Sequence, residues 1–252
     1  MNVPIIKVKD LRKRYGEQLV LDGVTFDIGR NSVTTIIGRS GGGKSVLLKH
    51  LSGLEKPDSG EITYEFPDVA CGGSLETRRV IRRLGILFQD GALFDSLTVA
   101  ENVAFPLREH TNLSDKEIRD IVRTRLTRVG MEAHAEKFPS QISGGMRKRA
   151  GLARALALEP CLVFFDEPTS GLDPVTSSSI YELIKTTHRE TAVTYVVVSH
   201  DIRGAFETSE VIMMLWEGKI LEQGSPEQMR RSTNPIVRQF ITGSVVGPIR
   251  LY

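Results

Sequence analysis

One glycine-rich stretch of the chain has the residue types and spacing of a phosphate-binding loop. It fits the pattern G-x-x-x-x-G-K-[ST] over residues 38–45. Glycines let backbone N–H groups wrap a triphosphate, while the lysine reaches the β and γ phosphates and the final hydroxyl ligates Mg²⁺. The stretch therefore predicts a site for a nucleoside triphosphate and magnesium. The residues concerned are Gly38, Arg39, Ser40, Gly41, Gly42, Gly43, Lys44 and Ser45.

Two carboxylates, Asp166 and Glu167, follow an apolar run that begins at Leu162. Ligands bind at the carboxyl edge of a parallel sheet, so a strand that ends here would present both side chains to a nucleotide. Asp166 is then a candidate magnesium ligand, and Glu167 is a candidate general base that accepts a proton from the attacking water. An acidic strand end facing solvent is the alternative, and the phosphate-binding loop upstream favours the catalytic interpretation.

A third motif, formed by Ser143, Gly144 and Gly145, precedes a helix rich in alanine and leucine. Serine is a favourable N-cap and the glycines expose backbone N–H groups, so this helix end is a second candidate anion site. Two phosphate-binding surfaces in one chain are most simply explained by two copies that each close over the other's nucleotide. Alone, the motif would indicate only a capped helix. The basic residues 147–149 either attract the partner's nucleotide or form an exposed face.

Strands that alternate with helices must position these motifs. Val33–Ile37 is a short β-branched run that ends at Gly38, and residues 44–54 have the apolar spacing of a helix. Further strands are expected at 84–88, 162–165 and 192–198, with a helix over about 174–189. This alternation predicts an α/β fold with a mainly parallel core sheet. Residues from about 90 to 158 are expected to form a helical subdomain, and 234–252 a C-terminal tail.

Length and composition limit the classes of function. The 252 residues suit one domain with a subdomain, and a net charge of +2 is small for a dedicated nucleic-acid binder. No apolar run approaches the roughly 18 residues needed to span a bilayer, and the N-terminus lacks a signal core. We therefore expect a soluble, cytosolic chain that binds no nucleic acid. If it serves a membrane process, other subunits must cross the membrane.

Taken together, these motifs resemble those of the ATP-binding subunit of ABC (ATP-binding cassette) transporters, along nearly all of residues 1–252. Residues 38–45 and 162–167 correspond to the Walker A and Walker B motifs, and residues 142–146 to the family signature. The resemblance implies a single nucleotide-binding domain with the P-loop NTPase fold and N-terminal antiparallel strands. It also implies ATP and Mg²⁺ as cofactors, an ATP-sandwich dimer and ATP hydrolysis coupled to transport.

The resemblance assigns roles to four further residues. Gln89 falls at the lid-loop glutamine that senses magnesium and the attacking water, and His200 at the switch histidine that contacts the γ phosphate. Asp173 lies in a segment similar to the loop that crosses the dimer. Tyr15 matches the aromatic residue that stacks on adenine. In the dimer, Ser143 and Gly145 of one chain would contact the γ phosphate held by Lys44 of the other.

Met146 replaces the glutamine that usually ends the signature, and Ser-Gly-Gly-Met is similar to the Mla phospholipid-trafficking ATPases. Residues 87–94 and 99–109 are similar to the same group. This resemblance implies permease subunits that contact region 89–105 and a lipid-binding subunit in the same complex. It also implies a peripheral position on the cytoplasmic face of the inner membrane. Five apolar residues of this region are expected to form a cleft for the permease helix, and the alternative is that they belong to the ordinary core of the subdomain. These residues are Ala92, Leu93, Phe94, Leu97 and Phe105.

The predicted function is ATP hydrolysis that drives Mla-type phospholipid trafficking, which maintains outer-membrane lipid asymmetry. The main alternative is an ABC transporter for an amino acid, a sugar or a metal, because the catalytic motifs are shared. A soluble ABC protein of DNA repair or translation would usually carry a coiled-coil insertion or a second cassette, and neither is present. A binding module without turnover is disfavoured by Glu167 and His200.

Overall fold

A six-stranded sheet with the order β5-β6-β7-β3-β8-β9 forms the centre of the computed structural model, which describes residues 4–66, 80 and 82–250. All neighbouring strands are parallel except the last pair, β8 and β9. This confirms the predicted α/β fold with its mainly parallel sheet. The strands are β3 (Val33–Ile37), β5 (Leu84–Leu87), β6 (Leu162–Asp166), β7 (Thr194–Val198), β8 (Val211–Trp216) and β9 (Lys219–Gly224).

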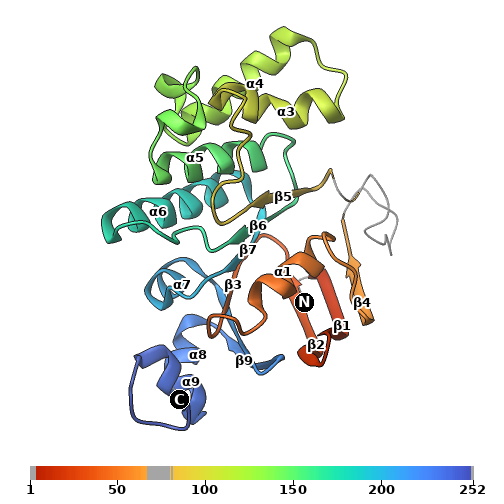
Figure 1. Ribbon diagram of the computed structural model, residues 1–252, viewed down its shortest axis with the longest axis vertical. Helices are drawn as coiled ribbons and strands as arrows, with labels where there is room; N and C mark the ends of the chain where they lie inside the picture. The colour runs from red at the N-terminus through yellow and green to blue at the C-terminus, as the bar shows by residue number, and fades with distance from the viewer. Residues whose placement is uncertain (1–3, 67–79, 81, 251–252) are drawn as a thin grey trace.

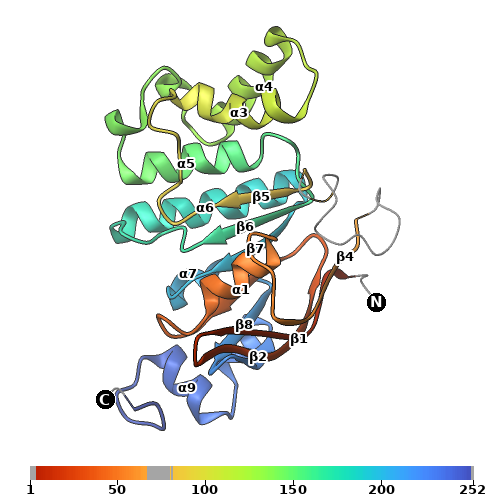
Figure 2. The same cartoon turned by 45° about the vertical axis from the view of Figure 1, so that its right-hand side comes forward.

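The central strands are buried on both faces, which explains their β-branched and apolar composition. Every residue of β3 and β7 is buried. Alternate side chains of β6 enter two different cores: Val163 and Phe165 pack in one, and Phe164 packs in the other. Helices α5 (Gly144–Ala155) and α6 (Pro174–Thr191) cover the first face, and α1 (Lys44–Leu51) covers the second (Figures 1 and 2).

A three-stranded antiparallel sheet with the order β2-β1-β4 packs on the far side of α1, as Figure 2 shows. Its strands are β1 (Pro4–Tyr15), β2 (Gln18–Gly29) and β4 (Ser59–Tyr64). This confirms the expected N-terminal antiparallel strands. Leu47 and Leu51 of α1 share one core with residues of both sheets, so the phosphate-binding loop is held between two rigid layers.

The helical region lies beyond edge strand β5, at the top of Figure 1. It contains α3 (Val99–His110), α4 (Asp115–Arg128), α5 and two short 3₁₀ turns, η1 (Glu132–His134) and η2 (Pro139–Gln141). Capping boxes at Thr98 and Ser114 start α3 and α4. At the other end lie α8 (Pro226–Arg230) and α9 (Pro235–Thr242), followed by the tail, while α7 (Ile202–Thr208) lies between α6 and this end (Figure 1).

Several element boundaries differ from the predicted ones by one to three residues: β5 ends at 87 rather than 88, β6 at 166 rather than 165, and α6 at 191 rather than about 189. At two further boundaries a left-handed backbone conformation lies beside the end of the element. Helix α1 stops at Leu51 rather than at residue 54, and Gly53 there has a φ of 75°. Strand β7 begins at Thr194 rather than at 192, because Ala192 has a φ of 53° and caps the end of α6.

Candidate functional site

The phosphate-binding loop connects the end of β3 to the first turn of α1, as its motif predicts. Gly43 has a φ of 92° and a Cβ there would lie 3.0 Å from Val20 Cγ1. A Cβ at Gly38 would collide with the carbonyl oxygen of Leu215. Both positions therefore require glycine, and the loop presents its backbone N–H groups at the N-terminus of a helix, where anions bind.

Lys44 is buried in this loop, with 5% of its surface exposed. Its Nζ donates hydrogen bonds to the carbonyl oxygens of Gly38 at 2.9 Å and Arg39 at 3.0 Å. Burial lowers the pKa of Lys44, against the opposing effect of Glu167, whose Oε1 lies 3.8 Å from Nζ. An ammonium held in this way fits a phosphate, because a bound anion would compensate the cost of its burial.

Ser45 and Asp166 form the candidate magnesium site. The Ser45 hydroxyl, on the first turn of α1, donates a 2.9 Å hydrogen bond to Asp166 Oδ1 at the end of β6. Hydroxyl and carboxylate oxygens are ligands that suit Mg²⁺, which keeps several waters and binds through few protein groups. This donor set beside the phosphate-binding loop fits the ion.

Glu167 and His200 meet at the ends of neighbouring strands β6 and β7. Glu167 Oε2 lies 2.7 Å from His200 Nδ1 and accepts a 3.2 Å hydrogen bond from the His200 backbone N–H. Glu167 has a φ of 48°, a left-handed conformation that is uncommon for a residue with a side chain. Such strain is concentrated at functional sites, where surrounding contacts hold it.

These groups converge on one hollow of about 400 Å³. Gln89 lies there as predicted, and its Nε2 donates a 3.1 Å hydrogen bond to Ser170 Oγ. Residues from β2, the phosphate-binding loop, the ends of β5, β6 and β7, and the segment after Glu167 thus share one surface. The lining residues are Gln18, Val20, Ser40, Gly41, Gly43, Lys44, Ser45, Val46, Gln89, Glu167, Ser170 and His200.

Tyr15 does not line the hollow and is 43% exposed. Its hydroxyl donates a 2.5 Å hydrogen bond to Glu55 Oε1, and Lys13 Nζ lies 5.2 Å from the centre of its ring. The hydrogen bond to Glu55 raises the pKa of Tyr15. Tyr15 is therefore a fixed aromatic surface on the N-terminal sheet and not a core residue, and its stacking on adenine remains a prediction.

The residues of the predicted second anion site are not among those that line the hollow. Ser143 caps α5, with its Oγ accepting a 3.3 Å hydrogen bond from Met146 N–H. A Cβ at Gly145 would lie 2.6 Å from Thr176 Cγ2, so the glycine permits close packing against the start of α6. Asp173 caps α6 by accepting from Val175 and Thr176 N–H groups, and the hydrogen bond with Thr176 lowers its pKa. Ser143, Gly145 and Asp173 thus belong to neighbouring helix ends.

Comparisons with known proteins agree with this arrangement. The family model described as "ABC transporter" matches residues 21–170. The chain belongs to the ABC transporter family. It is 39% identical over 250 residues to the intermembrane phospholipid transport system ATP-binding protein MlaF of Haemophilus influenzae, covering 99% of this chain and 95% of that protein. It is 43% identical to the probable ribonucleotide transport ATP-binding protein mkl of Mycobacterium leprae, covering 97% of this chain and 70% of that protein.

The fold also matches a solved ABC cassette. A dimeric post-hydrolysis structure of the ATP-binding cassette MJ0796, bound to ADP and Pi, superposes with a TM-score of 0.77 and 32% identity. The match covers 88% of this chain and 98% of that one. The chain is thus a nucleotide-binding ATPase subunit of an ABC transporter. Within the part of the chain that the structure describes, no helix has the length and apolarity to cross a membrane.

Lys148 makes buried contacts in this ABC ATPase that its sequence context does not indicate. The basic run 147–149 was expected to attract a nucleotide or to form an exposed face, yet Lys148 is buried. Its Nζ donates to the backbone carbonyl of Gln89 and, at 3.3 Å, to that of Glu167. The available signal was helical spacing, because Lys148 shares the buried face of α5 with Gly145 and Leu152.

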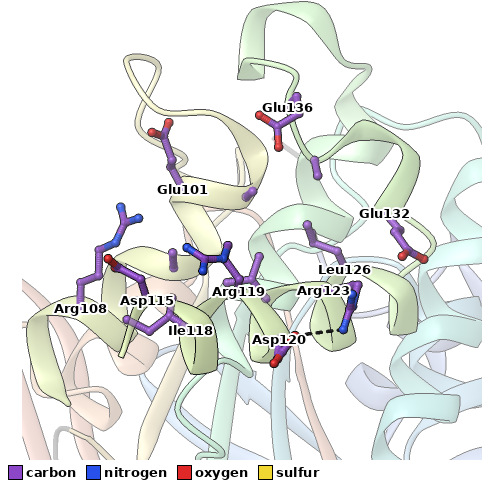
Figure 3. A pocket seen from close by; sticks show the side chains of 14 residues that line it. Glu101, Arg108, Asp115, Ile118, Arg119, Asp120, Arg123, Leu126, Glu132 and Glu136 are labelled. Carbon is purple, nitrogen blue, oxygen red and sulfur yellow. Dashed lines mark hydrogen bonds and ion pairs between the residues drawn. The ribbon is translucent and has the colours of Figure 1, made fainter. Parts of the chain in front are cut away.

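A second hollow, of about 560 Å³, lies in the helical region of the ABC cassette, and its side chains are drawn in Figure 3. Residues of α3, α4 and the segment after α4 line it. Charges of both signs surround it, among them Arg108 and Asp115, and a 3.0 Å ion pair joins Asp120 and Arg123 (Figure 3). None of the predicted site residues lines this hollow, so it is not part of the nucleotide site despite its size.

Proposed function

We propose that this chain is the ATPase subunit of an ABC transporter that moves phospholipid between membranes, and that two copies close around two Mg-ATP molecules. The observation that carries the proposal is that only one of the two candidate phosphate-binding helix ends lines the hollow. Lys44 and Ser45 line it with Glu167, whereas Ser143, which caps α5, does not. The relatives named for phospholipid transport, together with Met146 in the signature, favour lipid as the substrate.

Within one chain, residues 38–45 hold the triphosphate. The backbone N–H groups and Lys44 Nζ stabilise its negative charge. Ser45 and Asp166 would hold Mg²⁺, which would supply further positive charge to the triphosphate. Gln89 lines this site, hydrogen-bonded to Ser170, where it would respond to the metal and the attacking water. Tyr15 supplies the surface for the base.

Glu167 acts as the general base in this proposal. Its carboxylate lies beside Lys44 Nζ and against the His200 ring, so it is fixed in direction toward the phosphate-binding loop. A base held in this way accepts a proton from water without first reorganising. His200 holds the carboxylate in place and reaches the γ phosphate with its remaining ring nitrogen.

The second copy completes the site. Ser143, Gly144 and Gly145 of that copy contribute backbone N–H groups and a hydroxyl to the γ phosphate, and Asp173 lies at the same contact. ATP touches both chains only in the closed dimer, so it shifts the population toward closure. Hydrolysis removes the contact that ATP makes with both chains, so the dimer opens. The opening and closing of the dimer is passed to the membrane subunits.

Region 89–105 is the proposed contact with those membrane subunits. Phe94 and Phe105 are exposed there, at 45% and 39%, and their ring centres lie 4.8 Å apart. Exposed paired aromatic rings are typical of interaction surfaces, because they bury large apolar areas. Ala100 and Ala104 of the same region also line the hollow of the helical region. The subunit would thus sit on the cytoplasmic face of the inner membrane, in a complex with a lipid-binding subunit.

Transport of a small solute is the competing proposal. The catalytic groups are the same for an amino acid, a sugar or a metal, and a relative named for ribonucleotide transport is as similar as those named for phospholipid. The two proposals differ in the subunits bound at Phe94 and Phe105, and this difference can be measured directly.

The test is an affinity pull-down of the tagged chain from detergent-solubilised membranes, with proteins and lipids identified by mass spectrometry. Recovery of a permease with a lipid-binding subunit and phospholipid is expected. Recovery of a permease with a solute-binding protein would replace lipid by a small solute. Changing both Phe94 and Phe105 to Ala should abolish recovery, whereas Leu54→Ala, a loss of another exposed apolar side chain, should not.

A further inference from the structure

A buried tyrosine lies beneath the segments that carry Glu167 and His200. Tyr181, on α6, is 4% exposed. Its hydroxyl hydrogen-bonds with Thr169 Oγ1 at 3.2 Å and with Ser199 Oγ at 3.3 Å. One phenol oxygen thereby joins the two segments that follow β6 and β7.

Both partners of Tyr181 are coupled to the catalytic groups through short stretches of backbone. Thr169 lies two residues after Glu167, and Ser170 N–H donates a 3.1 Å hydrogen bond to the Glu167 carbonyl. Ser199 directly precedes His200, and its Oγ accepts a 3.0 Å hydrogen bond from Asp201 N–H. A shift of either hydroxyl therefore moves Glu167 or His200.

The position of the Tyr181 ring is itself fixed. A Cβ at Gly204 of α7 would overlap the ring, so the tyrosine occupies space that only a glycine leaves open. Burial raises the pKa of Tyr181 to about 12, and its hydroxyl therefore remains protonated and available as a donor at neutral pH. Tyr181 is thus a rigid, neutral link with two polar contacts.

We propose that Tyr181 is a positioning residue for ATP hydrolysis, which sets the spacing of the Glu167 carboxylate and the His200 ring through Thr169 and Ser199. This inference rests on the proposed roles of Glu167 and His200. Tyr181 is buried and does not line the hollow. It acts by keeping the 2.7 Å contact between Glu167 Oε2 and His200 Nδ1 in the geometry that directs the carboxylate toward the attacking water.

The experiment compares Tyr181→Phe with Tyr195→Phe in steady-state ATPase assays and thermal unfolding. Tyr195 is a matched control, because it is buried and its hydroxyl also bonds to α6, at Thr187 Oγ1 at 3.1 Å, away from the hollow. Tyr195→Phe loses one buried hydrogen bond and Tyr181→Phe loses two, so Tm should fall by about 2–4 °C in Tyr195→Phe and by about twice as much in Tyr181→Phe. Only Tyr181→Phe should lower kcat, by about tenfold, with KM for ATP unchanged.

Two further readouts separate positioning from a loss of stability. The pH profile of kcat should change in Tyr181→Phe and not in Tyr195→Phe, because only the former loosens the Glu167–His200 pair. Thr169→Val should lower kcat by itself but add little to Tyr181→Phe, since both remove the same link. Equal kcat in the two tyrosine variants, a change confined to KM, or additive losses would each overturn the inference.

Glu167→Gln, assayed in parallel, distinguishes failure of the positioning role of Tyr181 from failure of the proposed function. Near-normal hydrolysis by Glu167→Gln would overturn the role of Glu167, and with it the basis of the inference. If Glu167→Gln is inactive but Tyr181→Phe has the same kcat as Tyr195→Phe, only the positioning role of Tyr181 is overturned.

Discussion

The N-termini of α1 and α5 are both suited to bind phosphate, yet their surroundings differ. Around the start of α1, the structure gathers a buried ammonium, a hydroxyl, two carboxylates and an imidazole. Around the start of α5 it places a capping serine, two glycines and the packed side chains of Leu172 and Thr176. The nearby carboxylate of Asp173 is already used to cap α6.

The comparison indicates that both helix ends can bind phosphate, but that the groups suited to hydrolyse it lie at the α1 end. The α1 end gathers the candidate phosphate-binding, magnesium-binding and base groups within one chain, whereas the α5 end offers backbone N–H groups and one hydroxyl. Because Ser143 does not line the hollow around Lys44, we expect a second copy to complete each nucleotide site. Hydrolysis should therefore depend on the association of two chains. Substitutions at the two helix ends should differ in their effects on ATP binding and hydrolysis.

The largest effect is expected at the α1 end. Glu167→Gln removes the proposed base while it keeps the side-chain shape, so hydrolysis should fall by about 10³-fold with ATP binding retained. Because ATP is then not consumed, the ATP-bound dimer should accumulate. Size-exclusion chromatography measures the dimer, and a phosphate-release assay measures hydrolysis. Glu61→Gln, at an exposed carboxylate on β4, should change neither reading. Near-normal hydrolysis by Glu167→Gln would contradict its assignment.

A smaller loss is expected at the α5 end, and of a different kind. Ser143→Asp keeps a favourable N-cap but places a negative charge against the partner's γ phosphate. Hydrolysis should fall by about 10²-fold, as when one stabilising donor is lost, while the isolated chain binds ATP normally. Equilibrium binding and turnover measured on the same preparation check this.

The matched control is Ser225→Asp, because Ser225 also caps a helix, α8, through its hydroxyl. Its activity should equal that of the unchanged chain. If Ser143→Asp lost ATP binding as well, the α5 end would belong to the same site as α1, and the contrast between the two ends would fail.

The smallest effect concerns the metal. Asp166→Asn leaves one oxygen near Ser45 but removes the charge, so the Mg²⁺ concentration for half-maximal hydrolysis should rise about tenfold. A magnesium titration of ATPase activity measures this, and a chelator should stop hydrolysis in both proteins. Asp27→Asn, at an exposed carboxylate on β2, is the control. An unchanged requirement for Mg²⁺ in Asp166→Asn would remove Asp166 from the metal site.

The sequence predicts the α1 end well, because its residues occupy the ends of strands whose order is set by α/β topology. A buried run that stops at Asp166 or Ser199 can end only at the carboxyl edge of a parallel sheet. Lys44 and Glu167, which follow two such strands, are therefore expected at the same edge of the sheet. The antiparallel N-terminal sheet and the helical region also agree with expectation.

Residues that act through distant partners could not be predicted in this way. Lys148 stands in a basic run, and only the packing of α5 on β5, where Gly151 lies against Leu87, buries it beneath Gln89 and Glu167. Helical spacing indicates that Tyr181 is buried, but its hydroxyl partners come from two loops that no local pattern brings together. Tertiary contacts, not motif residues, determine both roles.

Subunit complementation tests the claim of a shared site most directly. Lys44→Ala and Ser143→Asp chains should each be nearly inactive. Mixing them forms heterodimers in which one nucleotide has an intact Lys44 from one chain and an intact Ser143 from the other. The account predicts hydrolysis well above the sum of the separate variants. Activity that stays at that sum, in a mixture shown to exchange subunits, would contradict a site completed by the second copy.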